Sequence, residues 1–238
     1  MNKLKCFIVL LLSICCLTGC GESAEKILED TLVNMRDLKT LKMTLKAEVG
    51  SSLYSLEILE EGTYAENSSY IKTTTSIVGN ESINESYSLK KDGKIYTYHK
   101  EAEKEDWKYN IKELQDDNDD LSAVKTIADN YKTVKKVKSE KSGYTKLEVT
   151  LDNSKTPSLL GEDEQAEGFD FSKDLILDLY IKDGYIAIIK INLSNILTED
   201  YAEDITKYTM RFELSDYNKV NEIEIPKDIL DNAKLEEE

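Results

Sequence analysis

The stretch LILDLYIKDGYIAIIKINL, residues 175–193, decides the fold. Asp183-Gly184 separates two alternating runs, and Asp-Gly in that position is a strong signal for a two-residue hairpin turn. The turn places six apolar residues on one face of the hairpin: Leu175, Leu177, Leu179, Ile181, Ile186 and Ile188. The other face receives Ile176, Tyr180, Tyr185, Ala187, Ile189 and Ile191, with Asp178. In an antiparallel sheet with one solvent-exposed face, apolar and polar residues alternate more regularly than they do here. Both faces of this hairpin are therefore covered by other elements, or one of them lines a cavity.

The residues before the hairpin predict a helix followed by strands. Apolar residues at helical spacing predict an amphipathic helix over 23–38 with Ser23 as its N-cap, and alternation begins at Leu41. The predicted strands are 41–49, 54–60, 69–78, 81–90 and 94–100, with a second Asp-Gly turn at residues 92–93. A second helix is expected from 116 onward, then strands near Thr133, at 144–151, in the hairpin, at 204–214 and at 220–225, and a short helix over 226–233.

This order contains no recurring strand-helix-strand unit, which argues against a parallel sheet. We therefore expect an α+β fold in which one large, curved antiparallel sheet packs on two or three helices. The mature chain has no Ser/Gly/Pro-rich linker. Residues 23–238 are expected to form a single domain.

The N-terminus has the layout of a signal peptide. Lys3 and Lys5 precede a 12-residue apolar run, which is short for a membrane span. The run ends on Leu17-Thr18-Gly19-Cys20, which resembles a bacterial lipobox. That resemblance implies cleavage after residue 19, a diacylglyceryl group on Cys20 and a short tether, residues 20–22. The alternative is an ordinary secretory peptide or a short anchor helix.

The cysteines and the charge narrow the function further. All four cysteines lie in the first 20 residues, so a mature chain would have no disulfide and no free thiol. It would carry 29 basic and 47 acidic residues, a net charge of −18. Such a surface repels nucleic acid and anionic lipid head groups. We expect attachment to the extracytoplasmic face of the cell membrane through the lipid on Cys20, and no nucleic-acid partner.

Motifs for catalysis or metal binding are weak. His99 is the single histidine and no G-x-S-x-G motif accompanies it. The acidic run 116–120 fits the first three ligand positions of an EF-hand, but Leu121 and Ile127 stand where glycine and glutamate are required. Acidic residues at a helix start are favoured by the helix dipole. We expect no catalytic residue, no metal, no cofactor and no enzymatic activity.

The chain resembles a group of Gram-positive lipoproteins over residues 23–234. The shared features are the lipobox, the amphipathic helix, the first strand KTLKMTLKAEV, the hairpin DGKIYTY with Trp107 after it, and the C-terminal run from INLSNIL to KDILDNA. The arrangement is similar to the LolA/LolB and LppX-LprG group of lipoprotein and lipid carriers. That resemblance implies an unclosed antiparallel half-barrel wrapped round helices, and it transfers no binding residue.

Two functional hypotheses remain open. In the first, the half-barrel binds a lipid or another amphiphile, the six hairpin residues named first line its cavity, and four apolar residues of the acidic stretch 153–172 form a lid: Leu159, Leu160, Phe169 and Phe171. In the second, the core is fully packed and the protein is an anchored interaction or sensor domain of the cell envelope. Its binding surface would be acidic or would use the face shared by Tyr87, Leu89, Tyr96 and Tyr98.

Overall fold

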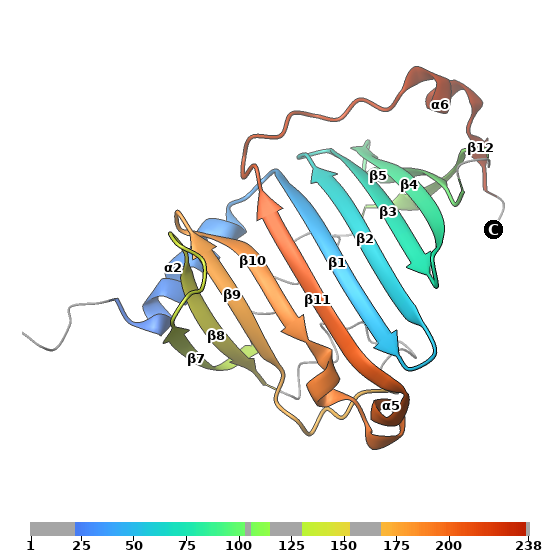
Figure 1. The fold of residues 1–238 in the computed structure, drawn as a ribbon. Helices are drawn as coiled ribbons and strands as arrows, with labels where there is room; N and C mark the ends of the chain where they lie inside the picture. Colours follow the sequence, from blue (N-terminus) through green and yellow to red (C-terminus); the bar gives the residue numbers. More distant parts are fainter. Residues whose placement is uncertain (1–21, 103–105, 115–129, 153–167, 237–238) are drawn as a thin grey trace, which may run out of the picture.

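A computed structural model describes residues 22–102, 106–114, 130–152 and 168–236, and it is dominated by one sheet (Figure 1). The strands are β1 (Leu41–Ser51), β2 (Ser55–Tyr64), β3 (Ser68–Ile77), β4 (Asn80–Lys91), β5 (Lys94–Lys100), β6 (Lys108–Glu113), β7 (Tyr131–Val137), β8 (Thr145–Leu151), β9 (Ile176–Lys182), β10 (Tyr185–Asn192), β11 (Ile205–Ser215) and β12 (Lys234–Leu235). Their order across the sheet is β12-β6-β5-β4-β3-β2-β1-β11-β10-β9-β8-β7. Every pairing is antiparallel except that of β12 with β6.

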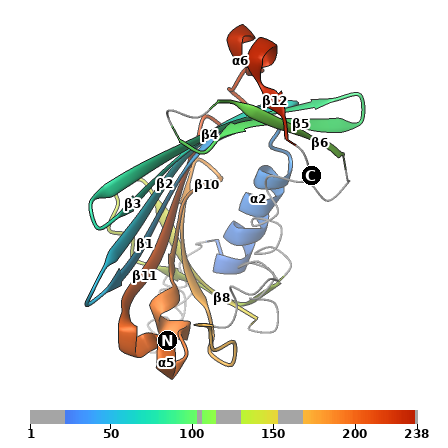
Figure 2. The same ribbon diagram turned by 90° about the vertical axis from the view of Figure 1, so that its right-hand side faces the viewer.

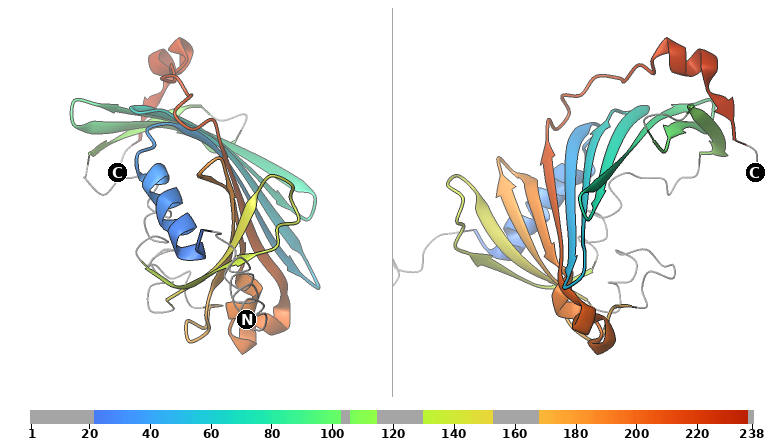
Figure 3. Two further views of the ribbon diagram at one scale, coloured as in Figure 1. Left: turned by 90° about the vertical axis from the view of Figure 1, so that its left-hand side faces the viewer. Right: turned by 45° about the vertical axis from the view of Figure 1, so that its right-hand side comes forward.

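The sheet curves around the helix α2 (Ala24–Arg36), which lies on its concave face (Figures 2 and 3). Ser23 begins the helix as predicted, because its Oγ accepts the backbone N–H of Lys26 at 3.2 Å. The helix buries one stripe against the sheet, namely Leu28, Thr31, Leu32 and Met35. The half-barrel is unclosed, since β12 and β7 end the sheet without pairing with each other. The predicted α+β half-barrel is therefore confirmed.

The tight turns follow the predicted chemistry. Asp92-Gly93 and Asp183-Gly184 both adopt positive φ angles, as a type I′ hairpin turn requires. Val78-Gly79 makes a third such turn, with φ of 50° and 82°, between β3 and β4. Gly184 is required for a second reason, because a Cβ there would lie 2.9 Å from Nδ2 of Asn34. That amide donates to the Gly184 carbonyl at 2.9 Å and so fixes α2 to the hairpin turn.

A β-bulge in β10 corrects the predicted faces of the central hairpin. Ile186 pairs with Ile181, but the next paired residue is Ile188, which lies opposite Tyr180. The extra residue, Ala187, reverses the orientation of everything after it. Ile188 therefore belongs to the convex face, and Ile189 and Ile191 join Leu177 and Leu179 on the concave face. The prediction for Ile188 was wrong because a simple two-residue hairpin register was assumed along the whole strand.

The hydrophobic core lies between α2 and the β7–β11 half of the sheet. It contains the five remaining hairpin residues Leu175, Leu177, Leu179, Ile181 and Ile186, together with residues of α2, β8 and the 3-10 helix η3 (Leu193–Ile196). Because these side chains are between 0% and 6% exposed, they stabilise the fold by removing apolar surface from water.

The stretch between β11 and the C-terminal helix passes the sheet without joining it. After β11 the chain passes over the ends of the central strands to the helix α6 (Lys227–Asn232) and then to β12 (Figure 3). The strand predicted over 220–225 is absent, although Val220, Ile223 and Ile225 alternate as a strand would. The segment passes beside β1, which is already paired with β2 on one side and β11 on the other, so it cannot add to the sheet there. Its backbone N–H groups bond to side chains instead: Val220 donates to Oγ1 of Thr40, and Ile223 donates to Oγ of Ser68.

Two further differences concern single elements. The strand β6 was missed, because Tyr109 and Ile111 alternate with polar residues over only six positions. The short helix α5 (Glu199–Asp204) before β11 was not predicted either. The helix expected from residue 116 onward lies outside the described residues, as do the signal peptide and Cys20.

Truncation of the core should show which face of β9 is buried. We expect Leu177→Ala to lower the free energy of unfolding by about 2–5 kcal/mol, because Leu177 is 0% exposed. The adjacent Ile176 is 46% exposed on the opposite face and provides a matched control, so Ile176→Ala should cost under about 1 kcal/mol. Urea unfolding followed by circular dichroism measures both. Equal losses would contradict the assignment of faces.

Candidate functional site: the concave face

The concave face changes character along a single cross-strand row. Residues in register on β8, β9, β10, β11 and β1 are all apolar, and they are Leu147, Leu179, Ile189, Phe212 and Leu45. On β2 the same row reaches Glu60, and on β3 and β4 it continues with Thr73 and Asn84. The concave face is thus apolar over one half and polar over the other, with Glu60 at the border.

The apolar half extends beyond the packed core. Leu147, Leu179 and Ile189 belong to the core, and Phe212 packs against it in a half-buried position. On β1, Leu41 and Ala47 are buried, but five concave apolar side chains of β1, β2 and β3 that lie outside the core are only half-buried, namely Leu45, Val49, Leu56, Ile58 and Ile71. We call these five residues the apolar extension. It presents apolar surface at the centre of the half-barrel, where an apolar ligand would find van der Waals contact.

Glu60 carries an ionisable group into this surface. Its direct cross-strand neighbours are Leu45 and Thr73, and Ile58 precedes it on the same face. Burial raises the pKa of Glu60 above its ordinary value, because the carboxylate loses solvation. Within the described part of the chain, its carboxyl group has no hydrogen-bond or ion-pair partner. A carboxyl group in this position can bond to a hydroxyl or amine of a ligand.

The polar half combines small neutral groups with three lysines, Lys90, Lys108 and Lys112, which the register places on the same side. Hydroxyl and amide side chains on the concave side of β3, β4, β5 and β6 are Thr73, Thr75, Ser82, Asn84, Ser86, Ser88, Thr97 and Asn110. The hydroxyls of Ser88 and Thr97 lie 3.4 Å apart, and Oδ1 of Asn110 is buried without a hydrogen-bond partner. His99 lies at the edge of this half, with its Nε2 3.6 Å from Oε2 of Glu236.

The predicted ligand residues are only partly brought together. Leu175, Leu177, Leu179, Ile181 and Ile186 share the concave side but are core residues, and their role in lining a ligand cavity stays a prediction. In the proposed lid, Phe169 bridges to Leu197 and its ring lies 5.8 Å from that of Tyr208 and 6.2 Å from that of Phe171. Leu159 and Leu160 lie outside the described residues.

The convex face carries an aromatic row that the sequence revealed only in part. Tyr87, Leu89, Tyr96 and Tyr98 share one face, as predicted. The structure adds Tyr70 and Tyr109, which lie in register with Tyr87 and Tyr98. Ring centroids are 4.7 Å apart for Tyr70 and Tyr87, and 5.5 Å for Tyr98 and Tyr109. These residues were missed because their pairing depends on the register between different strands.

Two other kinds of feature are absent from the described residues. No group of three or more histidine, cysteine, aspartate or glutamate side chains there could hold a metal ion. None of the described helices is long and apolar enough to cross a membrane.

No protein-family profile and no curated protein matches the sequence. In fold, the chain is similar to the Mycobacterium tuberculosis lipoprotein LppX, with a TM-score of 0.44 and 11% identity over 83% of this chain and 96% of that one. It is also similar to a beta-barrel-like protein of the domain of unknown function DUF1849 from Brucella abortus, with a TM-score of 0.26 and 9% identity over 75% and 96% of the two chains.

Glu60 should make stability depend on pH in a direction opposite to that of a salt-bridged carboxylate. Its folded-state pKa is raised above the ordinary 4.5, so the folded state binds the proton more tightly than the unfolded state. Stability from this group is therefore present below pH 4.5 and is lost as pH rises through the raised pKa. We expect Glu60→Gln to raise Tm at pH 7 and to leave it nearly unchanged at pH 4, measured by calorimetry.

The exposed neighbour Glu61 lies on the opposite face and provides the control. Glu61→Gln should give no comparable gain at pH 7. A Glu60→Gln protein that is less stable than the parent at pH 7 would show that the carboxylate is bonded rather than merely desolvated.

Proposed function

We propose that the protein is a membrane-anchored, extracytoplasmic lipoprotein that binds a hydrophobic or amphiphilic ligand, such as a lipid or a lipidated molecule, on the concave face of its half-barrel. The proposal assigns the apolar part of the ligand to the apolar extension and its polar part to the neighbourhood of Glu60. Function requires binding and release, without a covalent step.

The observation that carries the proposal is the amphipathic division of the concave face. In a fully packed core, apolar side chains would be buried throughout, as they are between α2 and the β7–β11 half. Instead, the half-buried apolar extension ends against a carboxyl group and a field of hydroxyl and amide groups. A surface that is apolar at one end and hydrogen-bonding at the other is complementary to an amphiphile.

The second candidate is an anchored interaction or sensor domain, and the convex aromatic row favours it. Tyrosine and tryptophan are enriched in recognition surfaces because one end of the side chain is apolar and the other is polar. Part of the row is covered within the chain, since Tyr87 lies 5.7 Å from Trp107 and close enough to α6 for the charge of Asp228 to act on it. This covering leaves the amphiphile site on the other face as the preferred proposal.

Native mass spectrometry of the domain from Ser23 onward tests the ligand directly. We expect the purified protein to retain lipid that a competing fatty acid displaces. A protein that carries no lipid and gains none when incubated with short-chain phospholipid or fatty acid would favour the interaction-domain alternative.

A charge placed in the apolar extension should abolish binding. Ile58→Asp buries a second carboxylate beside Glu60 and removes apolar contact, so lipid affinity should fall at least about tenfold. The control is Leu59→Asp on the same strand, because Leu59 is 38% exposed on the convex side. Fluorescent fatty-acid displacement measures both. Loss of binding in both variants, or in neither, would contradict a concave site.

The anchor is tested separately at Cys20. A Cys20→Ser chain expressed in a Gram-positive host should lose metabolically incorporated radiolabelled palmitate and move from the membrane fraction to the medium or the soluble fraction. One acyl chain binds a membrane only weakly, so the two chains of a diacylglyceryl group are needed for stable attachment. Retention of label in the variant would exclude Cys20 as the attachment site.

A further inference from the structure

Three cations lie side by side on the convex face, opposite the proposed lipid site. Lys190 on β10 is directly paired with Arg211 on β11, and Arg211 is directly paired with Lys46 on β1. Directly opposed side chains in an antiparallel sheet have Cβ atoms about 5 Å apart, and like charges in that position destabilise the pairing. The chain as a whole has a net charge of −16, so a row of three adjacent cations runs against its general charge.

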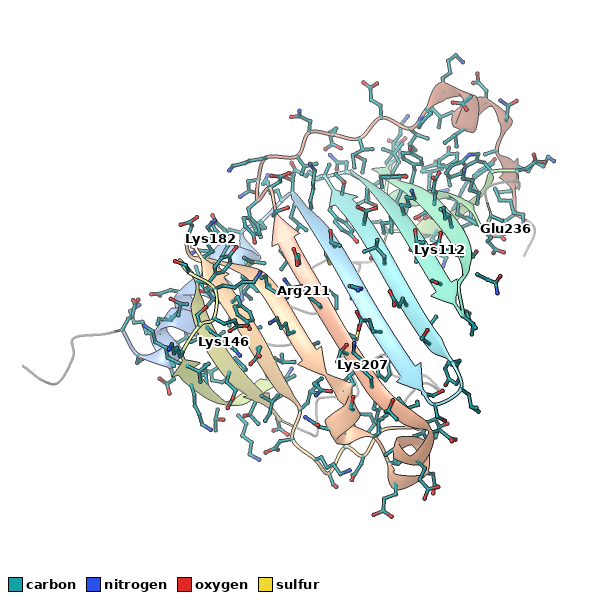
Figure 4. All side chains as sticks on the ribbon, in the orientation of Figure 1. Lys112, Lys146, Lys182, Lys207, Arg211 and Glu236 are labelled. Atoms are coloured by element: carbon teal, nitrogen blue, oxygen red, sulfur yellow. The ribbon has the colours of Figure 1, made fainter. Side chains whose placement is uncertain are left out.

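The same three side chains line a pocket of about 440 Å³. Its base is formed in the neighbouring cross-strand row, where the short side chains of Asn192 and Thr209 lie opposite each other. A row of long cationic side chains therefore stands beside a row of short polar ones, and this difference in length contributes to the hollow. Asn195 of η3 also lines it. Figure 4 shows Arg211 on the face of the sheet that is turned away from α2. The volume is in the range of small-molecule sites.

Each of the three cations is held by a carboxylate. Lys190 lies 3.1 Å from Glu140, and Arg211 lies 2.5 Å from Glu213. Both N–H donors that Arg211 gives to Glu213 go to a single oxygen, Oε1. The other N–H groups of the guanidinium remain available for a second acceptor. Lys46 is bound to Glu48 at 2.7 Å.

The acidic residues in the pocket wall are themselves neutralised. Asp178 is bound by Lys146 at 2.7 Å, and Glu48 is bound by Lys207 as well as by Lys46. Both additional lysines lie on this same face (Figure 4). The ion pairs of Lys190, Arg211 and Lys46 are partly exposed to solvent, and solvent-exposed ion pairs contribute at most about 1 kcal/mol each, so an incoming anion can compete for these three cations at little cost.

Lys190 is positioned by more than its carboxylate. Its Nζ lies 2.9 Å from the hydroxyl of Tyr180 and 4.6 Å from the centroid of that ring. Tyr180 is fully buried, although it lies on the convex side. The ammonium group therefore rests on a fixed aromatic surface and loses less conformational freedom on binding a ligand than a solvated lysine would.

From this arrangement we propose that the convex pocket binds a phosphate group, with Arg211 at its centre and Lys190 and Lys46 on either side. Arginine donates to phosphate through a planar fork, and flanking ammonium groups add charge. A divalent oxyanion is an acceptor that all three cations can share, while Asn192, Asn195 and Thr209 supply neutral hydrogen-bonding groups. Inorganic phosphate, a soluble phosphate ester and a phospholipid head group share this chemistry.

Isothermal titration calorimetry tests the site on the full chain in dodecyl maltoside at pH 7 and low salt. The three probes are inorganic phosphate, glycerol 1-phosphate and monomeric dihexanoylphosphatidylglycerol. We expect saturable binding with one phosphate per chain and a Kd in the millimolar range or tighter. Equal affinities for the three probes would identify inorganic phosphate as the ligand. Tighter binding of glycerol 1-phosphate would identify a soluble phosphate ester, and tighter binding of the short-chain lipid would identify a phospholipid head group.

Three variants distinguish a specific phosphate site from non-specific electrostatic attraction to the convex face. Arg211→Gln should weaken binding of the preferred probe at least about tenfold, the effect of losing roughly 1.4 kcal/mol. Lys182→Gln removes the same charge from the same face outside the pocket and should change affinity less than about twofold. Asp178→Asn removes a negative charge from the pocket wall and should strengthen phosphate binding. Misfolding would weaken binding in every variant, so it could not produce weaker binding in Arg211→Gln together with stronger binding in Asp178→Asn.

The proposal is overturned if none of the three probes binds saturably up to about 10 mM. It is also overturned if Arg211→Gln and Lys182→Gln weaken binding equally, because that result describes diffuse attraction. Neither outcome bears on the concave site, since Ile58→Asp and lipid retention report on the opposite face.

Discussion

The antiparallel pairing of β1 with β11 is the contact on which the rest of the structure depends. It joins the first strand of the sheet to the last long one, over a register from Lys42–Ser215 to Ser51–Ile205. The two hairpin-linked halves of the chain, β1–β6 and β7–β11, meet only along this ladder in the described sheet. The entropy of closing so long a loop is offset by the ladder and by the core that it completes, because Leu214 and Met43 face each other across it on the side of α2.

This pairing also sets the chemistry of the two faces. On the concave side the pairing makes the apolar surface of β8–β11 continuous with that of β1 and β2. Without this pairing, the apolar extension would not adjoin the apolar residues of β11. On the convex side it aligns Lys46 with Arg211 and thereby completes the row of three cations. One hydrogen-bonded ladder thus generates both an apolar surface on the concave side and, on the reverse of the same strands, a row of cations.

Local signals in the sequence were sufficient for much of the fold. The Asp-Gly turns, the cap at Ser23 and the period-two strands are encoded within a few residues, and the structure confirms them. The bulge at Ala187 has no such local signal, because nothing in an alternating run of isoleucines marks the residue that is left unpaired. The C-terminal segment 220–225 has strand-like alternation, but only the tertiary structure shows that the strands beside it, β1 and β3, are already paired on both sides.

The candidate site was harder to predict than the fold. Glu60 follows Leu56 and Ile58 at a spacing of two, so its presence on an apolar face was readable in the sequence, yet its importance depends on Leu45 and Thr73 from other strands. The cation row and the aromatic row likewise join residues that are far apart in the chain, and their register cannot be derived from composition or spacing.

The open edges of the half-barrel have a mechanical consequence. A closed barrel fixes its radius through its strand number and shear, and changing the radius means breaking hydrogen bonds. Here β7 and β12 are free of each other, so each ladder can alter its twist by a few degrees within the ordinary range while all interstrand bonds persist. Summed over the strands, such changes widen or narrow the concave face. The width of the concave face is therefore adjustable, and the proposed site could accept ligands of different diameter with the same set of side chains.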